Sequence, residues 1–138
     1  MIKRILALFF LGFFAFAPFA WSKQEEPEKR KDYIDINPQE LYQMLKKKDF
    51  TLINTHIPYA GEIHQTDLFV PFNEIEKHID KLPKEKDAKI VIYCRSGRMS
   101  SIASAALVEM GYKNVLHLKG GMKAWVKAGY MLIKKKQK

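Results

Sequence analysis

The chain has 138 residues, a formal net charge of +9 and a single cysteine. A chain of this length predicts one domain, which excludes multidomain enzymes. The single cysteine excludes an internal disulfide and any cysteine-rich zinc or iron–sulfur site. The positive charge comes from dispersed lysines, a distribution that does not indicate nucleic-acid binding.

The N-terminal segment has the pattern of a secretory signal peptide. Two basic residues precede an almost unbroken apolar run at residues 5–21, and the small residues Ala20 and Ser22 suit cleavage before Lys23. We therefore predict a cleaved signal peptide at residues 1–22 and a periplasmic or secreted protein. The alternative is an N-terminal membrane anchor, because the apolar run approaches the length that spans a bilayer.

From residue 33 onward, short apolar runs alternate with helical patterns, which is typical of a parallel sheet with crossover helices. The apolar runs predict strands at residues 51–54, 68–70, 90–93 and 115–118. Asn37 and Asn73 are each followed by a glutamate three residues later, a spacing that predicts helix starts. Helical spacing also follows residues 98 and 121. We therefore predict an α/β fold with a central parallel β-sheet flanked by helices on both faces.

The composition divides the chain into four segments. The predicted domain occupies residues 33–131, after the signal peptide and a polar, charge-mixed tether at residues 23–32. Residues 132–138 are rich in lysine and are predicted to form a basic, solvated tail. The alternative for this tail is contact with an anionic membrane surface.

The only cysteine, Cys94, follows the apolar strand predicted at residues 90–93 and precedes a helix. Ligands of open α/β sheets bind just beyond the carboxyl ends of the strands. Backbone N–H groups and the positive end of a helix dipole at such a turn favour a thiolate or a bound anion. Arg95 and Arg98 add positive charge to the same loop. We therefore interpret Cys94 as a reactive thiol rather than an inert core residue.

Two motifs make a family resemblance specific. Residues 94–100 read Cys-Arg-Ser-Gly-Arg-Met-Ser, and residues 118–122 read Leu-Lys-Gly-Gly-Met, followed by Trp125 and Gly129. Together they resemble a single-domain rhodanese, and the similarity extends from residue 37 to residue 130. The resemblance implies a rhodanese-like fold and a sulfurtransferase. In that family the loop cysteine attacks the outer sulfur of a donor such as thiosulfate, becomes a persulfide and passes the sulfur to cyanide or a thiol.

The resemblance also implies a set of site residues, with no cofactor and no metal. Cys94 is the nucleophile, and the backbone amides of the following residues cradle the terminal sulfur. These loop residues are Arg95, Ser96, Gly97, Arg98, Met99 and Ser100. The implied partners are a small sulfur-containing anion, a thiol or cyanide acceptor and a protein that relays sulfur.

Two alternatives to a sulfurtransferase enzyme remain. The first is a periplasmic binding or relay module, which accepts persulfide sulfur from one protein and delivers it to another. The second is a small phosphatase or an arsenate reductase that uses the same cradle. The loop at residues 94–99 disfavours the second, because its length is the one associated with sulfur transfer and the related phosphatases carry one residue more.

Several positions depart from the family pattern. Met99 stands where many members have Arg, Thr or Ser, and Ser100 is interpreted mainly as a helix cap that can also supply a hydroxyl. Residues 54–56 read Asn-Thr-His where members often read Asp-Val-Arg, so an Asp–Arg ion pair is missing. These differences indicate a divergent subgroup.

The remaining candidates are histidines and their neighbours. His56, Glu62 and His64 lie in a predicted loop near the carboxyl edge of the sheet. We interpret them as ordinary polar loop residues, with a metal site or a proton donor as the alternative. His117 lies in an apolar strand and is interpreted as a hydrogen-bonded core residue, and Trp125 is interpreted as core.

Overall fold

The computed structural model describes residues 31–136. The predicted signal peptide at residues 1–22 and most of the predicted tether lie outside the described residues. Within residues 31–136, none of the helices is both long enough and apolar enough to cross a membrane.

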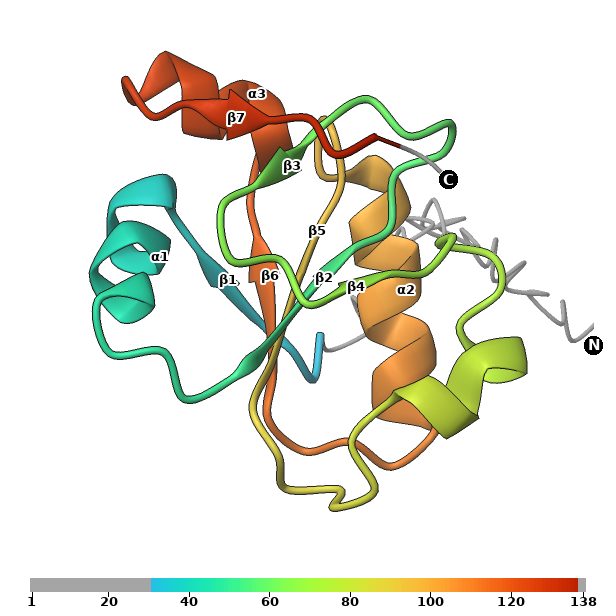
Figure 1. Cartoon of the computed structure of the whole chain (residues 1–138). Coiled ribbons are helices and arrows are strands. Elements are labelled where there is room, and N and C mark those ends of the chain that lie inside the picture. Colours follow the sequence, from blue (N-terminus) through green and yellow to red (C-terminus); the bar gives the residue numbers. More distant parts are fainter. Residues whose placement is uncertain (1–30, 137–138) are drawn as a thin grey trace, which may run out of the picture.

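A five-stranded parallel sheet forms the centre of the molecule (Figure 1). The sequence predicts the parallel sheet and four of its five strands, but not the strand at residues 34–36. Its strand order is β1-β6-β5-β2-β4. The strands are β1 (Ile34–Ile36), β2 (Thr51–Asn54), β4 (Leu68–Phe69), β5 (Ile90–Tyr93) and β6 (Val115–Leu118). All four residues of β5 are buried, because this central strand is covered on both faces.

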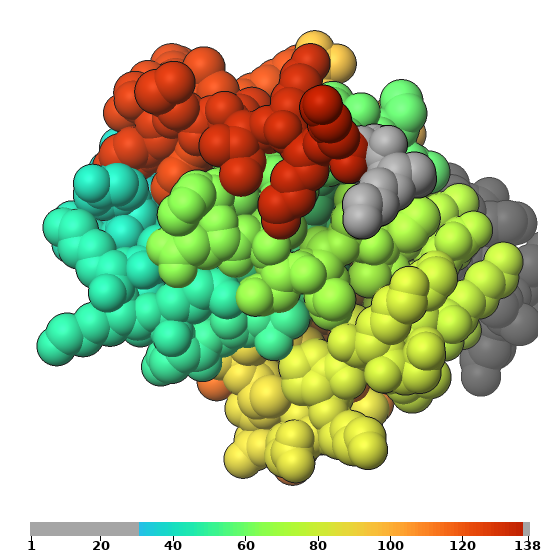
Figure 2. Space-filling model, in the orientation of Figure 1, coloured from blue at the N-terminus to red at the C-terminus, as the bar shows by residue number. Residues whose placement is uncertain are grey.

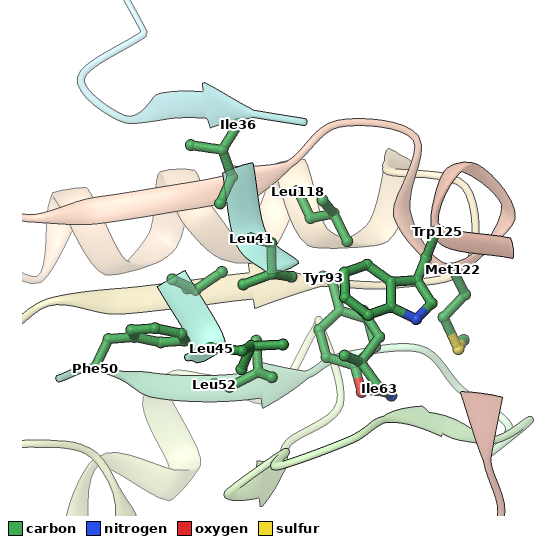
Figure 3. Close-up of a cluster of buried hydrophobic side chains, with 11 residues drawn as sticks. Ile36, Leu41, Leu45, Phe50, Leu52, Ile63, Tyr93, Leu118, Met122 and Trp125 are labelled. Atoms are coloured by element: carbon green, nitrogen blue, oxygen red, sulfur yellow. Dashed lines mark hydrogen bonds between the residues drawn. The ribbon is translucent and has the colours of Figure 1, made fainter. Parts of the chain in front are cut away.

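Helices cover both faces of the sheet, which confirms the predicted architecture. Side chains of α1 (Pro38–Leu45) and α3 (Gly121–Lys127) pack in one apolar core, and those of α2 (Arg98–Glu109) pack in the other. Figure 3 shows the first core, in which side chains from α1 and α3 meet the side chain of Tyr93 from β5. The second core also holds Ile75 and Leu82, which flank the 3₁₀ helix η1 (Glu76–Lys81).

The two predicted asparagine caps have different outcomes. Asn37 forms the expected capping box, since its Oδ1 accepts from the Glu40 N–H at 2.8 Å and its own N–H donates to Glu40 Oε2 at 2.7 Å. The predicted cap at Asn73 is wrong. A backbone turn between Pro71 and Glu74 occupies this position, and η1 starts later without a side-chain cap.

The C-terminal segment differs from the predicted solvated tail. Strand β7 (Leu132–Ile133) pairs with β3 (Glu62–Ile63) in a small antiparallel sheet, and Leu132 packs against the first core. The ammonium group of Lys135 lies 2.7 Å from the carboxylate of Glu62. In Figure 2 this red segment lies over the green part of the chain that holds β3. Apolar residues 132 and 133 therefore belong to the folded domain, which continues past its predicted end at residue 131.

The loop that follows β5 is held by the start of α3. The N–H groups of Met122 and Lys123 donate to the carbonyl oxygens of Cys94 (2.8 Å) and Arg95 (2.9 Å). Gly121 lies between the two backbones with φ +57°, and a Cβ there would clash with the carbonyl oxygen of Cys94. A glycine is therefore required for this close approach.

We predict that Gly121→Ala lowers the free energy of unfolding more than Gly129→Ala does. The φ of Gly129, +95°, is less accessible to an alanine than the +57° of Gly121, but a Cβ at Gly129 would meet no atom within 4 Å. The control measures backbone strain alone, about 1–2 kcal/mol, and the clash at Gly121 adds about 1–3 kcal/mol. Urea unfolding of the two variants checks the difference, and equal destabilisation would contradict the proposed close contact.

Candidate active site

Cys94 lies at the carboxyl end of β5, directly before α2, as the sequence predicts. Cys94 is buried, with 1% of its surface exposed to solvent. Gly97 is the N-cap of α2 and has φ +100°, and a Cβ at Gly97 would lie 3.2 Å from the backbone nitrogen of Gly120. The loop therefore turns sharply into the helix at a position that favours glycine.

Two groups contact the sulfur of Cys94. The N–H of Gly97 donates to Sγ at 3.0 Å, and Oγ of Ser100 lies 3.2 Å from Sγ. The remaining loop residues lie outward, since Arg95, Ser96 and Arg98 are exposed and Met99 is half-buried. At these distances an amide N–H and a hydroxyl can each donate a hydrogen bond to negative charge on the sulfur.

The predicted capping role of Ser100 is wrong. Gly97 occupies the cap position, no side chain caps α2, and Ser100 is the third residue of the helix. Its side chain points back toward the loop, where Oγ lies 3.3 Å from the Gly97 carbonyl oxygen as well as near Sγ. The sequence carried one signal for this position, because Ser100 shares the buried face of α2 with Ala103 and Leu107.

His117 is a buried, hydrogen-bonded residue, as predicted, with 5% of its surface exposed. Its partners were not predicted. Nε2 lies 2.8 Å from Oγ of Ser100 and 3.1 Å from the carbonyl oxygen of Gly97. Nδ1 lies 2.7 Å from Oδ1 of Asp35. An unbroken chain of polar contacts thus leads from Cys94 through Ser100 and His117 to Asp35.

Strand register brings Asp35 to His117. The two residues are direct partners in the parallel pairing of β1 and β6, so their side chains project on the same face of the sheet. The ring of Tyr33 meets the imidazole edge-on, with ring centroids 5.6 Å apart. Local sequence patterns do not reveal which strands are neighbours, so they do not predict this pair.

The two loop arginines occupy different surroundings. Arg95 lines a pocket of about 290 Å³, together with Lys123 and four apolar residues, Ala60, Met122, Val126 and Leu132. Arg98 is the exposed first residue of α2. The charge of Arg95 also reaches His56: burial lowers the pKa of His56 below its ordinary value, and the positive charge of Arg95 lowers it further.

Asn54 organises the loop that lacks the family's Asp–Arg pair. Its Nδ2 donates to the carbonyl oxygen of Gly61 at 3.0 Å, and its Oδ1 accepts from the N–H of His56 at 3.1 Å. A neutral amide that bridges two backbone groups therefore holds this segment at the edge of the sheet.

The three residues weighed as a metal site have separate surroundings. Glu62 is buried and pairs with Lys135, and its Oε2 accepts from the hydroxyl of Tyr59 at 3.0 Å. His64 is exposed and His56 is partly buried. Within residues 31–136, no three His, Cys, Asp or Glu side chains gather as a group that could hold a metal ion.

Comparison with known proteins agrees with this architecture. The model of the rhodanese-like domain family matches residues 20–128. The chain is 36% identical over 104 residues to a sulfurtransferase of Allochromatium vinosum, covering 72% of this chain and 94% of the relative. It is 28% identical over 95 residues to the thiosulfate sulfurtransferase GlpE of Coxiella burnetii, covering 67% of this chain and 87% of the relative.

A solved structure gives the same result for the fold. A rhodanese-related protein of Thermoplasma volcanium superimposes with a TM-score of 0.64 at 25% identity, over 75% of this chain and 100% of that one. Several other matched relatives are longer proteins, of which the chain covers between 23% and 58%. The fold, the family match and the sulfurtransferase relatives together show that this chain belongs to the rhodanese-like domain family and has a function of the sulfurtransferase type.

Proposed function

We propose that this protein transfers sulfane sulfur through a persulfide on Cys94, from a donor such as thiosulfate to a thiol or cyanide. One observation carries the proposal. The sulfur of Cys94 receives the Gly97 N–H at 3.0 Å and lies 3.2 Å from the Ser100 hydroxyl, at the carboxyl end of a central strand. These contacts favour the thiolate, which is the nucleophilic form of cysteine.

The reaction proceeds in two displacements at sulfur. The Cys94 thiolate attacks the outer sulfur of thiosulfate, an S–S bond forms, and sulfite leaves with the electron pair of the bond that breaks. The acceptor then attacks the outer sulfur of the persulfide, and the Cys94 thiolate is the leaving group. Negative charge returns to Sγ in the second step, so the same donors serve both steps.

Arg95 is the residue that we propose attracts the anionic donor. A dianion that approaches a thiolate is repelled at long range, and a cation beside the loop offsets this repulsion. Arg95 lines the pocket next to the loop, and Lys123 lines the same pocket. Two cations beside a mainly apolar pocket suit a small sulfur anion or an anionic thiol.

The compartment is also a proposal. The N-terminal pattern supports export to a periplasm-like space, with the mature chain starting near Lys23. Mass spectrometry of the protein from fractionated cells should then find the shortened chain in the periplasmic fraction. A full-length chain that requires detergent would favour the membrane anchor instead.

We predict that Cys94→Ser abolishes sulfur transfer and leaves the fold intact. A serine hydroxyl fits the site but is not a comparable nucleophile at neutral pH. Two measurements check this: steady-state turnover of thiosulfate with cyanide, and the gain of one sulfur atom in the mass of the donor-treated protein. A variant that retains a tenth of the wild-type rate would show that Cys94 is not the carrier. A wild-type protein that forms the persulfide without turning over would favour the relay module.

We predict that Arg95→Ala raises the KM for thiosulfate and weakens its dependence on salt. Because Arg95 is exposed, the expected loss in kcat/KM is about fivefold, close to 1 kcal/mol. Arg98→Ala is the matched control, since it removes the same charge from the same loop outside this pocket's lining. It should have the smaller effect.

An independent measurement accompanies this comparison. In Arg95→Ala the pKa of His56 should rise, because one of the two causes that lower it is removed. Proton NMR of the His56 ring follows this change. Equal kinetic effects of the two arginine variants would show that Arg95 acts through net charge alone, and no effect of either would remove Arg95 from the proposal.

A further inference from the structure

A chain of four polar side chains leads from the buried thiol toward the surface. Sγ of Cys94 lies 3.2 Å from Oγ of Ser100, which lies 2.8 Å from Nε2 of His117. Nδ1 of His117 lies 2.7 Å from the carboxylate of Asp35, whose side chain is 34% exposed. The motif at residues 94–100 contains Cys94 and Ser100, but it does not account for His117 and Asp35.

The positions of the hydrogens follow from the chemistry of each group. An ionised carboxylate only accepts, so Nδ1 of His117 carries a hydrogen and donates it to Asp35. Nε2 of the neutral ring is then an acceptor, and the hydroxyl of Ser100 donates to it. The Ser100 hydroxyl can donate to Sγ when the sulfur is a thiolate, and at the same distance of 3.2 Å a thiol S–H can instead donate to a lone pair of Oγ. In the thiol state every donor therefore points along the chain toward Asp35.

One contact is better satisfied after a proton has moved. In the neutral ring, Nε2 lies 3.1 Å from the carbonyl oxygen of Gly97, so two acceptors face each other. Once Nε2 is protonated, it can donate to this oxygen while Nδ1 continues to donate to Asp35. Both ring nitrogens then face oxygen acceptors, which is the arrangement that suits an imidazolium.

We propose that His117, paired with Asp35, accepts the proton of the Cys94 thiol through the hydroxyl of Ser100. This inference rests on the proposed function, because it supplies the thiolate that attacks the sulfur donor. The S–H bond breaks and its proton moves to Oγ while the hydroxyl proton of Ser100 moves to Nε2. The products are a thiolate and an imidazolium, and the regenerated hydroxyl then donates to the thiolate.

The roles within the chain differ. Ser100 touches the reacting sulfur and is a catalytic residue, whereas His117 and Asp35 act through it and are positioning residues. The imidazolium stays close to the loop while sulfur is bound, so its charge also offsets the negative charge of the persulfide. If His117 and Asp35 served only to support the fold, replacing them would not change how readily the Cys94 thiol ionises.

Several ionisable groups surround the imidazole. Asp35 contacts it from β1, and Tyr33 meets it edge-on from the residues before that strand. Cys94 reaches it through Ser100 from the side of α2, while Ile92, its partner on β5, is apolar. The exposed Lys119 directly follows the end of β6. Of these groups, Asp35 is hydrogen-bonded to His117 directly, and Cys94 is joined to it through Ser100.

The test measures the rate of Cys94 alkylation by iodoacetamide as a function of pH. Iodoacetamide reports the thiolate directly and needs neither a sulfur donor nor an acceptor. In His117→Gln, which keeps a hydrogen-bonding group that does not titrate, the profile should shift to higher pH. The alkylation rate near pH 7 should fall about tenfold. Asp35→Asn, at a partly exposed position, should shift the profile in the same direction by less.

A double-mutant cycle separates a relay from independent contacts. If Ser100 connects Cys94 to His117, replacing His117 has no further effect once the hydroxyl is gone. Ser100→Ala and the double variant Ser100→Ala/His117→Gln should then have the same pH profile of alkylation. His64→Gln is the control, because it removes an exposed histidine outside the chain of contacts. Thermal unfolding verifies that each variant is folded, and Asp35→Asn carries the test if the buried substitutions do not fold.

The possible results separate this inference from the proposed function. A profile that is unchanged in both His117→Gln and Asp35→Asn overturns the relay, even if the persulfide forms normally. Fully additive shifts in the double variant overturn it as well. The expected shifts in a protein that never acquires sulfur from thiosulfate would leave the relay supported and refute the proposed donor.

Discussion

The site depends on two hydrogen bonds between backbones. The N–H groups of Met122 and Lys123, in the first turn of α3, donate to the carbonyl oxygens of Cys94 and Arg95 at 2.8 and 2.9 Å. These bonds fix the loop between α2 and α3. Only a residue without a Cβ fits at Gly121, where the two backbones meet. With the loop held in this way, the N–H of Gly97 and the hydroxyl of Ser100 both reach the sulfur. The glycine pair at residues 120–121 thus acts on the site although it contributes no functional group.

A second constraint is the register of β1 on β6. It places Asp35 beside His117 and so completes a polar chain that runs from the buried Ser100 and His117 to the partly exposed Asp35. Polar groups at this depth are costly when one partner is missing, and they are well defined in position when all are present. The stability of this region and the orientation of the Ser100 hydroxyl are therefore linked.

The sequence predicted local features well and long-range ones poorly. Strands at residues 51–54, 90–93 and 115–118 were predicted with the bounds that the structure has, because each is an apolar run between polar turns. The two-residue strands β3 and β7 carry too little pattern to be recognised. Cys94 was found from its turn, but Ser100 was interpreted as a cap, and His117 was placed in the core without its partners. These roles depend on which strand lies beside which, and local spacing contains no such information.

Two departures from the family pattern change the side chains around the loop. Met99 brings a thioether where many members have a hydroxyl or a guanidinium, so the loop loses a side-chain donor at that position. The next residue, Ser100, turns inward and presents its hydroxyl to the sulfur, with His117 behind it. At residues 54–56 both charges of the usual Asp–Arg pair are absent, and the neutral amide of Asn54 holds the segment by bridging the Gly61 carbonyl oxygen and the His56 N–H. The hydroxyl of Ser100 is therefore the side-chain donor at the sulfur, and the neighbouring segment is held through backbone groups without an ion pair.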